Sequence, residues 1–112
     1  MLLGGNVGLF GTRTRTDILC LIYLMEETHA SEVARLLDIR LSTAQNAIDS
    51  LEQTGVISGA LEGRSRRIRL NPRYFAREEV RALLEKMAEG DAELRAKVAT
   101  IRRRPRRAGK PL

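Results

Sequence analysis

A chain of 112 residues is long enough for one domain with a single buried core, and too short for two such cores. Its hydrophobic content of 43% and charged content of 30% suit a globular protein, and no run approaches the roughly 20 apolar residues of a membrane helix. A single cysteine, Cys20, excludes an internal disulfide, so a reducing cytoplasm is the expected location.

The net charge of +6 is concentrated in two places. Residues 102–112 hold six basic residues and no acid, which leaves 14 basic against 14 acidic residues in the rest of the chain. Residues 56–73 form the second concentration, with five arginines against Glu62 alone. A neutral body with a basic hairpin and a basic tail suits an anionic polymer as partner. For the tail, residues 104–112, which we expect to be disordered, the alternative is a solvated segment that only aids solubility.

The chain begins with a glycine-rich segment, residues 1–11, that carries the apolar residues Leu2, Leu3, Val7, Leu9 and Phe10. We expect this apolar arm to dock on the domain or on a second subunit. Thr12 is a suitable N-cap for a helix that runs to about Glu27. That helix is apolar almost all round, which predicts a central position or an interface.

A helix-turn-helix pattern follows. A short helix begins between His29 and Ser31 and ends at Leu37, a turn covers residues 38–40, and a longer helix runs from about Leu41 to Thr54. Apolar residues at Leu41, Ala44, Ile48 and Leu51 mark one face of this third helix. The opposite face is polar, and Gly55 supplies the residue that ends the helix.

The next segment predicts a β-hairpin. Residues 56–60 and 66–70 have strand character, Glu62-Gly63 forms the turn and Arg64 follows it. Ile68 and Leu70 alternate inward, whereas Arg67 points outward. Asn71-Pro72 ends the pairing, because proline cannot donate to the ladder.

Helical periodicity returns over residues 74–87, with Phe75, Val80, Leu83, Leu84 and Met87 on one side, and again over 92–103. Gly90-Asp91 either breaks or bends one long helix. The predicted fold is mostly α (α+β), a winged helix-turn-helix of three helices, a two-stranded wing and one or two C-terminal helices. Its parts are an arm (1–11), a DNA-binding domain (12–73), a helical dimerisation segment (74–103) and a basic tail (104–112).

The polar face of the third helix carries groups suited to reading the major groove of duplex DNA. Gln45 and Asn46 can each form the paired donor and acceptor bonds that suit adenine. Ser42 and Thr43 can bond bases or phosphates, and Asp49 can accept from a cytosine amine or repel phosphate. Polar residues of these types also occur on the solvent-exposed face of any amphipathic helix, but the hairpin that follows favours DNA reading.

The third helix contains no lysine or arginine, so the charge that neutralises phosphates must come from elsewhere. The available donors are the tail together with Arg40, Arg64, Arg66 and Arg67. Arg64 at the wing could enter a minor groove. We therefore expect the third helix to supply specificity, and the wing and tail to supply affinity.

Three segments, LFGTRTRTDIL, EVARLLDIRLSTAQNAIDSLEQTGVI and EGRSRRIRLNP, resemble the winged helix-turn-helix regulators of the ArsR/MarR-like superfamily over about residues 9–87. The glycine-centred run Leu51-Glu52-Gln53-Thr54-Gly55-Val56-Ile57 is the most telling part. The resemblance implies a homodimeric, sequence-specific transcriptional regulator of duplex DNA that dimerises through its first and last helices. The chain departs from the family pattern at Asp38 and Arg40, where glycine and serine are common.

No metal site, cofactor or enzymatic activity is expected. Cys20 stands alone on an apolar helix, His29 is the only histidine, and no phosphate-binding or catalytic motif occurs. Two other functions stay open. One is a winged helix used as a protein-interaction or assembly module, and the other is RNA binding, which a basic tail does not distinguish from DNA binding.

Overall fold

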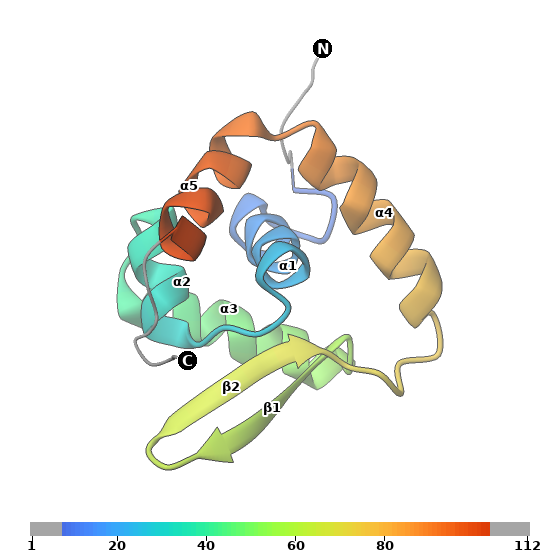
Figure 1. The fold of residues 1–112 in the computed structure, drawn as a ribbon. Helices are drawn as coiled ribbons and strands as arrows, with labels where there is room; N and C mark the ends of the chain where they lie inside the picture. Colours follow the sequence, from blue (N-terminus) through green and yellow to red (C-terminus); the bar gives the residue numbers. More distant parts are fainter. Residues whose placement is uncertain (1–7, 104–112) are drawn as a thin grey trace, which may run out of the picture.

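The computed structural model describes residues 8–103, and these form a mostly helical domain with a small antiparallel hairpin (Figure 1). The predicted winged-helix fold is confirmed. Most of the predicted arm, residues 1–7, and the tail, 104–112, lie outside the described residues. The elements in chain order are α1 (Arg13–Met25), α2 (Ala30–Leu37), α3 (Leu41–Thr54), β1 (Ile57–Glu62), β2 (Ser65–Leu70), α4 (Arg77–Glu89) and α5 (Ala92–Arg103).

Helix α1 is the centre of the domain. It begins as predicted at Thr12, whose side-chain oxygen accepts a hydrogen bond from the backbone N–H of Arg15 at 3.0 Å. Residues 18–22 are all fully buried, and α2, α3, α4, α5 and β2 pack around the helix (Figure 1). Residues 18–22 therefore lie in the core of their own chain, which is the central position that the sequence allowed for this helix, and a dimer contact through the rest of α1 stays a prediction.

The turn between α2 and α3 has the backbone that the sequence predicts. Asp38 adopts the left-handed conformation with φ of 57°, and the N–H of Ile39 donates to the Ala34 carbonyl at 3.0 Å. Gly55 ends α3 with φ of 87°, which glycine tolerates without strain. Three of the four predicted inner residues of α3 are buried, but Leu41 is 47% exposed, because it is the first residue of the helix and lies at its open end.

The hairpin is longer than predicted and turns more tightly. Its register pairs Ile57 with Leu70 and Glu62 with Ser65, so the turn consists of Gly63 and Arg64. Gly63 has φ of 61°, as the first central residue of a type II′ turn requires, and Arg64 stands in the turn rather than past it. Backbone bonds between Thr28 and Ile68 (3.1 and 2.8 Å) fasten β2 to the loop between α1 and α2.

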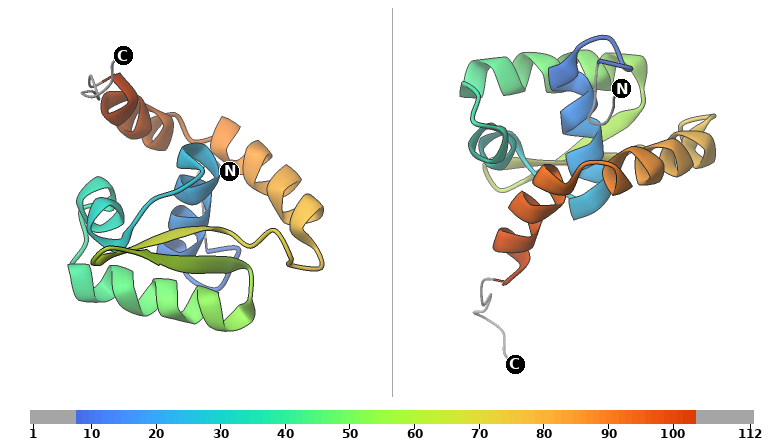
Figure 2. Two further views of the ribbon diagram at one scale, coloured as in Figure 1. Left: turned by 60° about the horizontal axis from the view of Figure 1, so that its bottom comes forward. Right: turned by 90° about the horizontal axis from the view of Figure 1, so that it is seen from above.

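Gly90 separates two helices, which resolves the open question about the C-terminal segment. The Asp91 carboxylate accepts from the backbone N–H of Leu94 at 3.0 Å and caps α5. Arg95 then reaches back to two carbonyls at the end of α4, those of Ala88 (3.1 Å) and Glu89 (3.2 Å). Figure 2 shows α5 leaving α4 at this corner.

The predicted apolar side of residues 74–87 is only partly buried. The helix starts later than expected, at Arg77, so Phe75 lies in the preceding turn and is 90% exposed. Leu84 is fully buried and Ala88 nearly so, whereas Leu83 is 40% exposed. Two large apolar side chains therefore remain on the outer side of α4 and the turn before it. At the other end of the chain, Phe10 packs against the core.

Candidate nucleic-acid interface

The outer face of α3 carries five exposed polar side chains. They lie opposite Ala44, Ile48 and Leu51, whose burial against the domain fixes which side of the helix faces outward. Because the buried side is anchored, the exposed side is a rigid platform of hydrogen-bonding groups. All of the residues predicted to read bases belong to it: Ser42, Thr43, Gln45, Asn46 and Asp49.

Arg40 stands at the start of this platform. It is the N-cap residue of α3, with φ of −66° and ψ of 146°, and its side chain makes no capping hydrogen bond. The positive end of the helix dipole, with backbone N–H groups that lack partners within the helix, therefore lies beside an exposed guanidinium. This combination suits a phosphate of a bound duplex.

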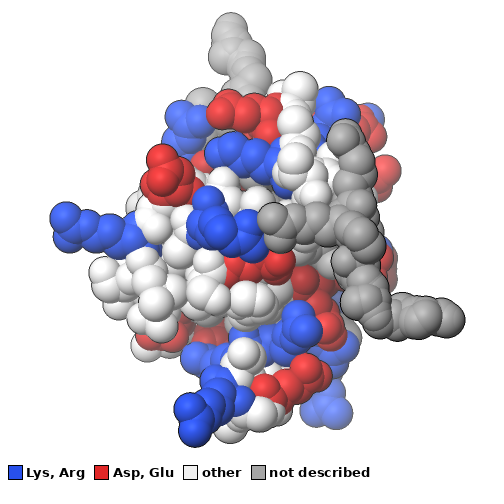
Figure 3. Space-filling model, turned by 60° about the vertical axis from the view of Figure 1, so that its left-hand side comes forward, with Lys and Arg blue, Asp and Glu red and all other residues white. Residues whose placement is uncertain are grey.

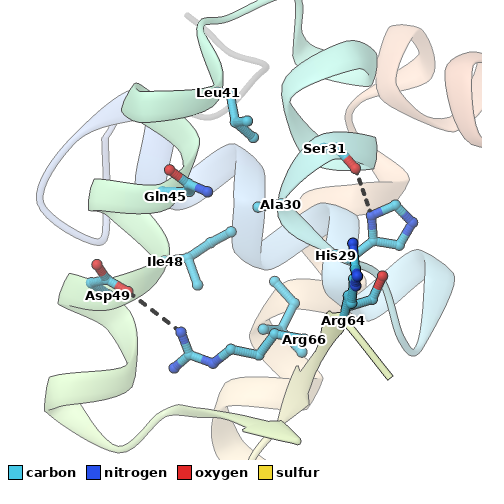
Figure 4. Close-up of a pocket in the computed structure, with 11 residues that line it drawn as sticks. His29, Ala30, Ser31, Leu41, Gln45, Ile48, Asp49, Arg64 and Arg66 are labelled. Carbon is cyan, nitrogen blue, oxygen red and sulfur yellow. Dashed lines mark hydrogen bonds and ion pairs between the residues drawn. The ribbon is translucent and has the colours of Figure 1, made fainter. Parts of the chain in front are cut away.

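A hollow of about 300 Å³ separates α3 from the hairpin and from the start of α2 (Figure 4). Gln45, Ile48 and Asp49 line one wall. The opposite wall has His29 and Ser31, bonded to each other at 2.9 Å, with Arg64 beside them. The structure thus brings the polar face of α3 and the tip of the wing, which are separate elements in the sequence, to one recess.

His29 and Ser31 were not predicted as interface residues. His29 caps α2, because its Nδ1 accepts from the backbone N–H of Glu32 at 3.4 Å, which agrees with the surface or cap role expected for it. Only the folded chain shows that the start of α2 borders the same hollow as α3.

The wing arginines have different surroundings. Within the part of the chain that the structure describes, Arg64 forms no ion pair with an acid and stands exposed at the tip. Arg67 lies on the face of the hairpin turned away from α3, where its Nε is 3.3 Å from the Glu62 carboxylate. Arg66 lies on the face of the hairpin toward α3, and its side chain is half exposed.

Arg66 bridges the hairpin to α3 through two ion pairs. One guanidinium nitrogen binds the Glu52 carboxylate directly, and the other is 3.7 Å from Asp49 (Figure 4). From the sequence, Glu52 is only a member of the glycine-centred run, with no partner predicted for it. The signal in the sequence was weak: two acids three residues apart on a helix, followed by an arginine-bearing strand.

Acids and bases alternate on this side of the molecule. Figure 3 shows blue side chains at the lower end, where the hairpin lies, with red side chains between them. Much of the hairpin's positive charge is therefore balanced within the domain. Arg40 and Arg64 are the predicted contacts for which the described residues show no acidic partner.

Neither of two further kinds of feature occurs in residues 8–103. No group of three or more His, Cys, Asp and Glu side chains is gathered as a metal ion would require. No helix of this segment is long and apolar enough to cross a membrane.

No family model matches the chain, and no curated protein matches it. Among solved structures, it resembles the adhesin competence repressor from Streptococcus pyogenes with a TM-score of 0.58 and 18% sequence identity. The alignment covers 84% of this chain and 68% of that one. At this identity the likeness shows a shared fold alone, and it confirms the predicted winged helix.

Proposed function

We propose that the chain is a transcriptional regulator that binds double-stranded DNA in a sequence-specific manner, with α3 in the major groove and the wing on the phosphate backbone or in the minor groove. Ser42, Thr43, Gln45, Asn46 and Asp49 read bases, and Arg40, Arg64 and Arg67 contact the backbone. The regulator acts in the cytoplasm as a homodimer.

One observation carries this proposal: the polar face of α3 and the unpaired arginine of the wing tip border the same hollow. A major groove about 12 Å wide admits one helix, and its flanking phosphates then lie within reach of structures beside that helix. Arg64 projects from the hairpin beside α3, as such a contact needs. Exposed polar residues on a helix alone would not distinguish a reading helix from an ordinary solvated face.

The homodimer is proposed to form through the C-terminal helices. Phe75, Leu83 and the outer side of α4 offer apolar surface that the described chain leaves uncovered. Helix α3 lies across α1 from α4 and α5, so a dimer through α4 and α5 would leave both copies of α3 exposed (Figure 2). Two reading helices related by twofold symmetry would then meet two half-sites.

The direct test is an anisotropy titration of the full chain with a labelled random-sequence DNA duplex, at salt concentrations from 50 to 200 mM, a range over which backbone contacts weaken measurably. We expect the logarithm of the binding constant to fall linearly with the logarithm of the salt concentration. No binding at about 100 µM protein in the lowest salt would contradict the proposal, because sequence-independent binding is typically of that strength or better. A parallel titration with single-stranded and double-stranded RNA tests RNA binding, and tighter binding to RNA would favour that alternative.

A further inference from the structure

The side of α3 that faces the hairpin is acidic. Asp49 and Glu52 are three residues apart, so they project from neighbouring turns on one side of the helix. Both contact the same guanidinium, that of Arg66 on β2. The helix proposed to enter the major groove, between two phosphate backbones, thus carries two carboxylates, and one arginine of the wing pairs with both.

The three side chains differ in exposure, and the difference shows which contact is the anchor. The Glu52 side chain is 17% exposed, against 62% for Asp49 and 50% for Arg66. A carboxylate with so little contact with water needs a hydrogen-bonding cation as partner. The planar guanidinium of arginine suits a carboxylate better than a lysine ammonium would. Glu52 is therefore the fixed point to which Arg66 is held, and Asp49 is a second, more exposed contact.

Gly59 leaves the space for this contact. It lies in β1 opposite Ile68, on the same face of the hairpin as Arg66. A Cβ atom at this position would be 2.6 Å from Glu52 Oε2 and 2.9 Å from Arg66 Nε. Since Gly59 sits in a regular antiparallel ladder, glycine is needed here for space and not for a left-handed backbone.

The ion pairs change what Arg66 can contribute to DNA binding. Sequence-independent affinity comes from cations that replace counterions along the phosphates, with a salt slope of about −0.9 for each phosphate neutralised. Arg66 is already neutralised by two carboxylates of its own domain, so it has little charge left for a phosphate. Its geometry instead ties the hairpin to the reading helix, which keeps the wing tip at a fixed distance from α3.

We infer that the ion pair with Glu52 keeps Arg66 from contacting the DNA backbone and holds the wing against α3. Arg66 is then a positioning residue, and this replaces the sequence-based prediction that it contacts the backbone. The arrangement lowers affinity for DNA in general and raises discrimination between sequences, because Arg64 can meet only a groove that fits the fixed spacing. The inference rests on the proposed function.

Glu52→Gln tests the inference, measured with a labelled random-sequence duplex across a salt series. The substitution frees Arg66, so we expect affinity to rise about three- to tenfold at low salt and the salt slope to steepen by about 0.9, the value of one added phosphate contact. Unchanged or weaker binding by Glu52→Gln would overturn the inference.

Loss of the Glu52 charge could by itself strengthen binding, so two controls separate the causes. Gly59→Ala changes no charge but displaces the flexible ends of Glu52 and Arg66, and it should act in the same direction. In an Arg66→Ala background, Glu52→Gln should have little effect, because no arginine remains to be released. An equal gain in affinity in both backgrounds would show a plain charge effect and contradict the inference.

The free protein offers a readout that needs no DNA. The ¹⁵N–¹H signal of Arg66 Nε should shift and exchange faster with water in Glu52→Gln, while the signal of Arg67, which pairs with Glu62, should not. If the wild-type chain fails to bind the duplex, the proposed function fails. If it binds and Glu52→Gln leaves both the salt slope and the Arg66 signal unchanged, only the role of Glu52 fails.

Discussion

Single residues on the α3 face and the wing differ in how they can act on DNA, and their partners in the fold decide this. Arg64 stands exposed in the turn of the hairpin, Arg67 pairs with Glu62, and Arg66 is held by acids of α3. Exposed pairs such as Arg67–Glu62 are worth about 0–1 kcal/mol, so a phosphate can compete for that arginine. The three arginines therefore differ in how readily each can contact a phosphate of the duplex.

Arg64→Ala should weaken binding to all DNA sequences alike and flatten the salt slope by roughly one, because it removes one backbone contact. Lys86→Ala is the matched control, since it removes one positive charge from α4, away from the wing tip. Anisotropy titrations over a salt series measure both. A loss confined to one preferred sequence would contradict a backbone role for Arg64.

The partners of these arginines could not be predicted from the sequence. Arg66 and Glu52 are 14 residues apart, and their contact depends on how the hairpin packs on α3. The alternation of side chains in a strand correctly put Arg67 on the outer face with Ile68 inward. It could not show that glycine at position 59, which has no side chain, leaves room on the inward face for the contact between Arg66 and Glu52.

At the scale of elements, local rules predicted where the helices begin and end. Thr12, Asp38 and Gly55 act as the sequence indicated, since capping and left-handed positions depend on a few neighbouring residues. The start of α4 was misplaced by a few residues, because the apolar period continues back into a turn where Phe75 is exposed. Periodicity alone does not separate a helix from the turn that leads into it.

Asp91→Ala should destabilise the domain by about 0.5–2 kcal/mol, because α5 loses the side chain that caps its first turn. Asp91→Asn keeps an oxygen that can accept the same hydrogen bond, so it should retain most of the stability. Urea denaturation followed by circular dichroism measures the difference. Equal losses in the two variants would mean that the charge of Asp91, and not its cap, stabilises the corner.

Leu84→Ala should cost about 2–5 kcal/mol of stability, because this fully buried side chain joins α4 to the core around α1. The neighbouring Leu83 is 40% exposed, so Leu83→Ala should cost well under half as much. The same denaturation experiment compares the pair. Similar losses for the two leucines would contradict the packing of α4 against α1.

At the scale of the whole molecule, the buried centre of α1 changes how a dimer could form. The sequence could not distinguish a central helix from an interface helix, since both are apolar all round. With residues 18–22 of α1 in the core of their own chain, the exposed apolar side chains near α4 become the candidate contact.

Sedimentation at micromolar concentration should therefore give about twice the 12.6 kDa of one chain. Phe75→Ser should shift the equilibrium toward the monomer, because Phe75 is the most exposed large apolar side chain beside α4. Leu61→Ser is the control, since Leu61 is 74% exposed but lies on the hairpin. A wild-type monomer would remove the proposed dimer and leave the DNA-binding face as it is.

Sequence-specific reading of duplex DNA is the central claim, and selection of bound sequences from a random duplex pool tests it most directly. We predict that the wild-type chain enriches a shared motif, and that two motif copies related by a twofold axis appear if the chain dimerises. Gln45→Ala should relax the preference at one position of the motif, since it removes one base contact worth about 1–3 kcal/mol. A selected pool that stays as random as the starting pool would contradict the claim.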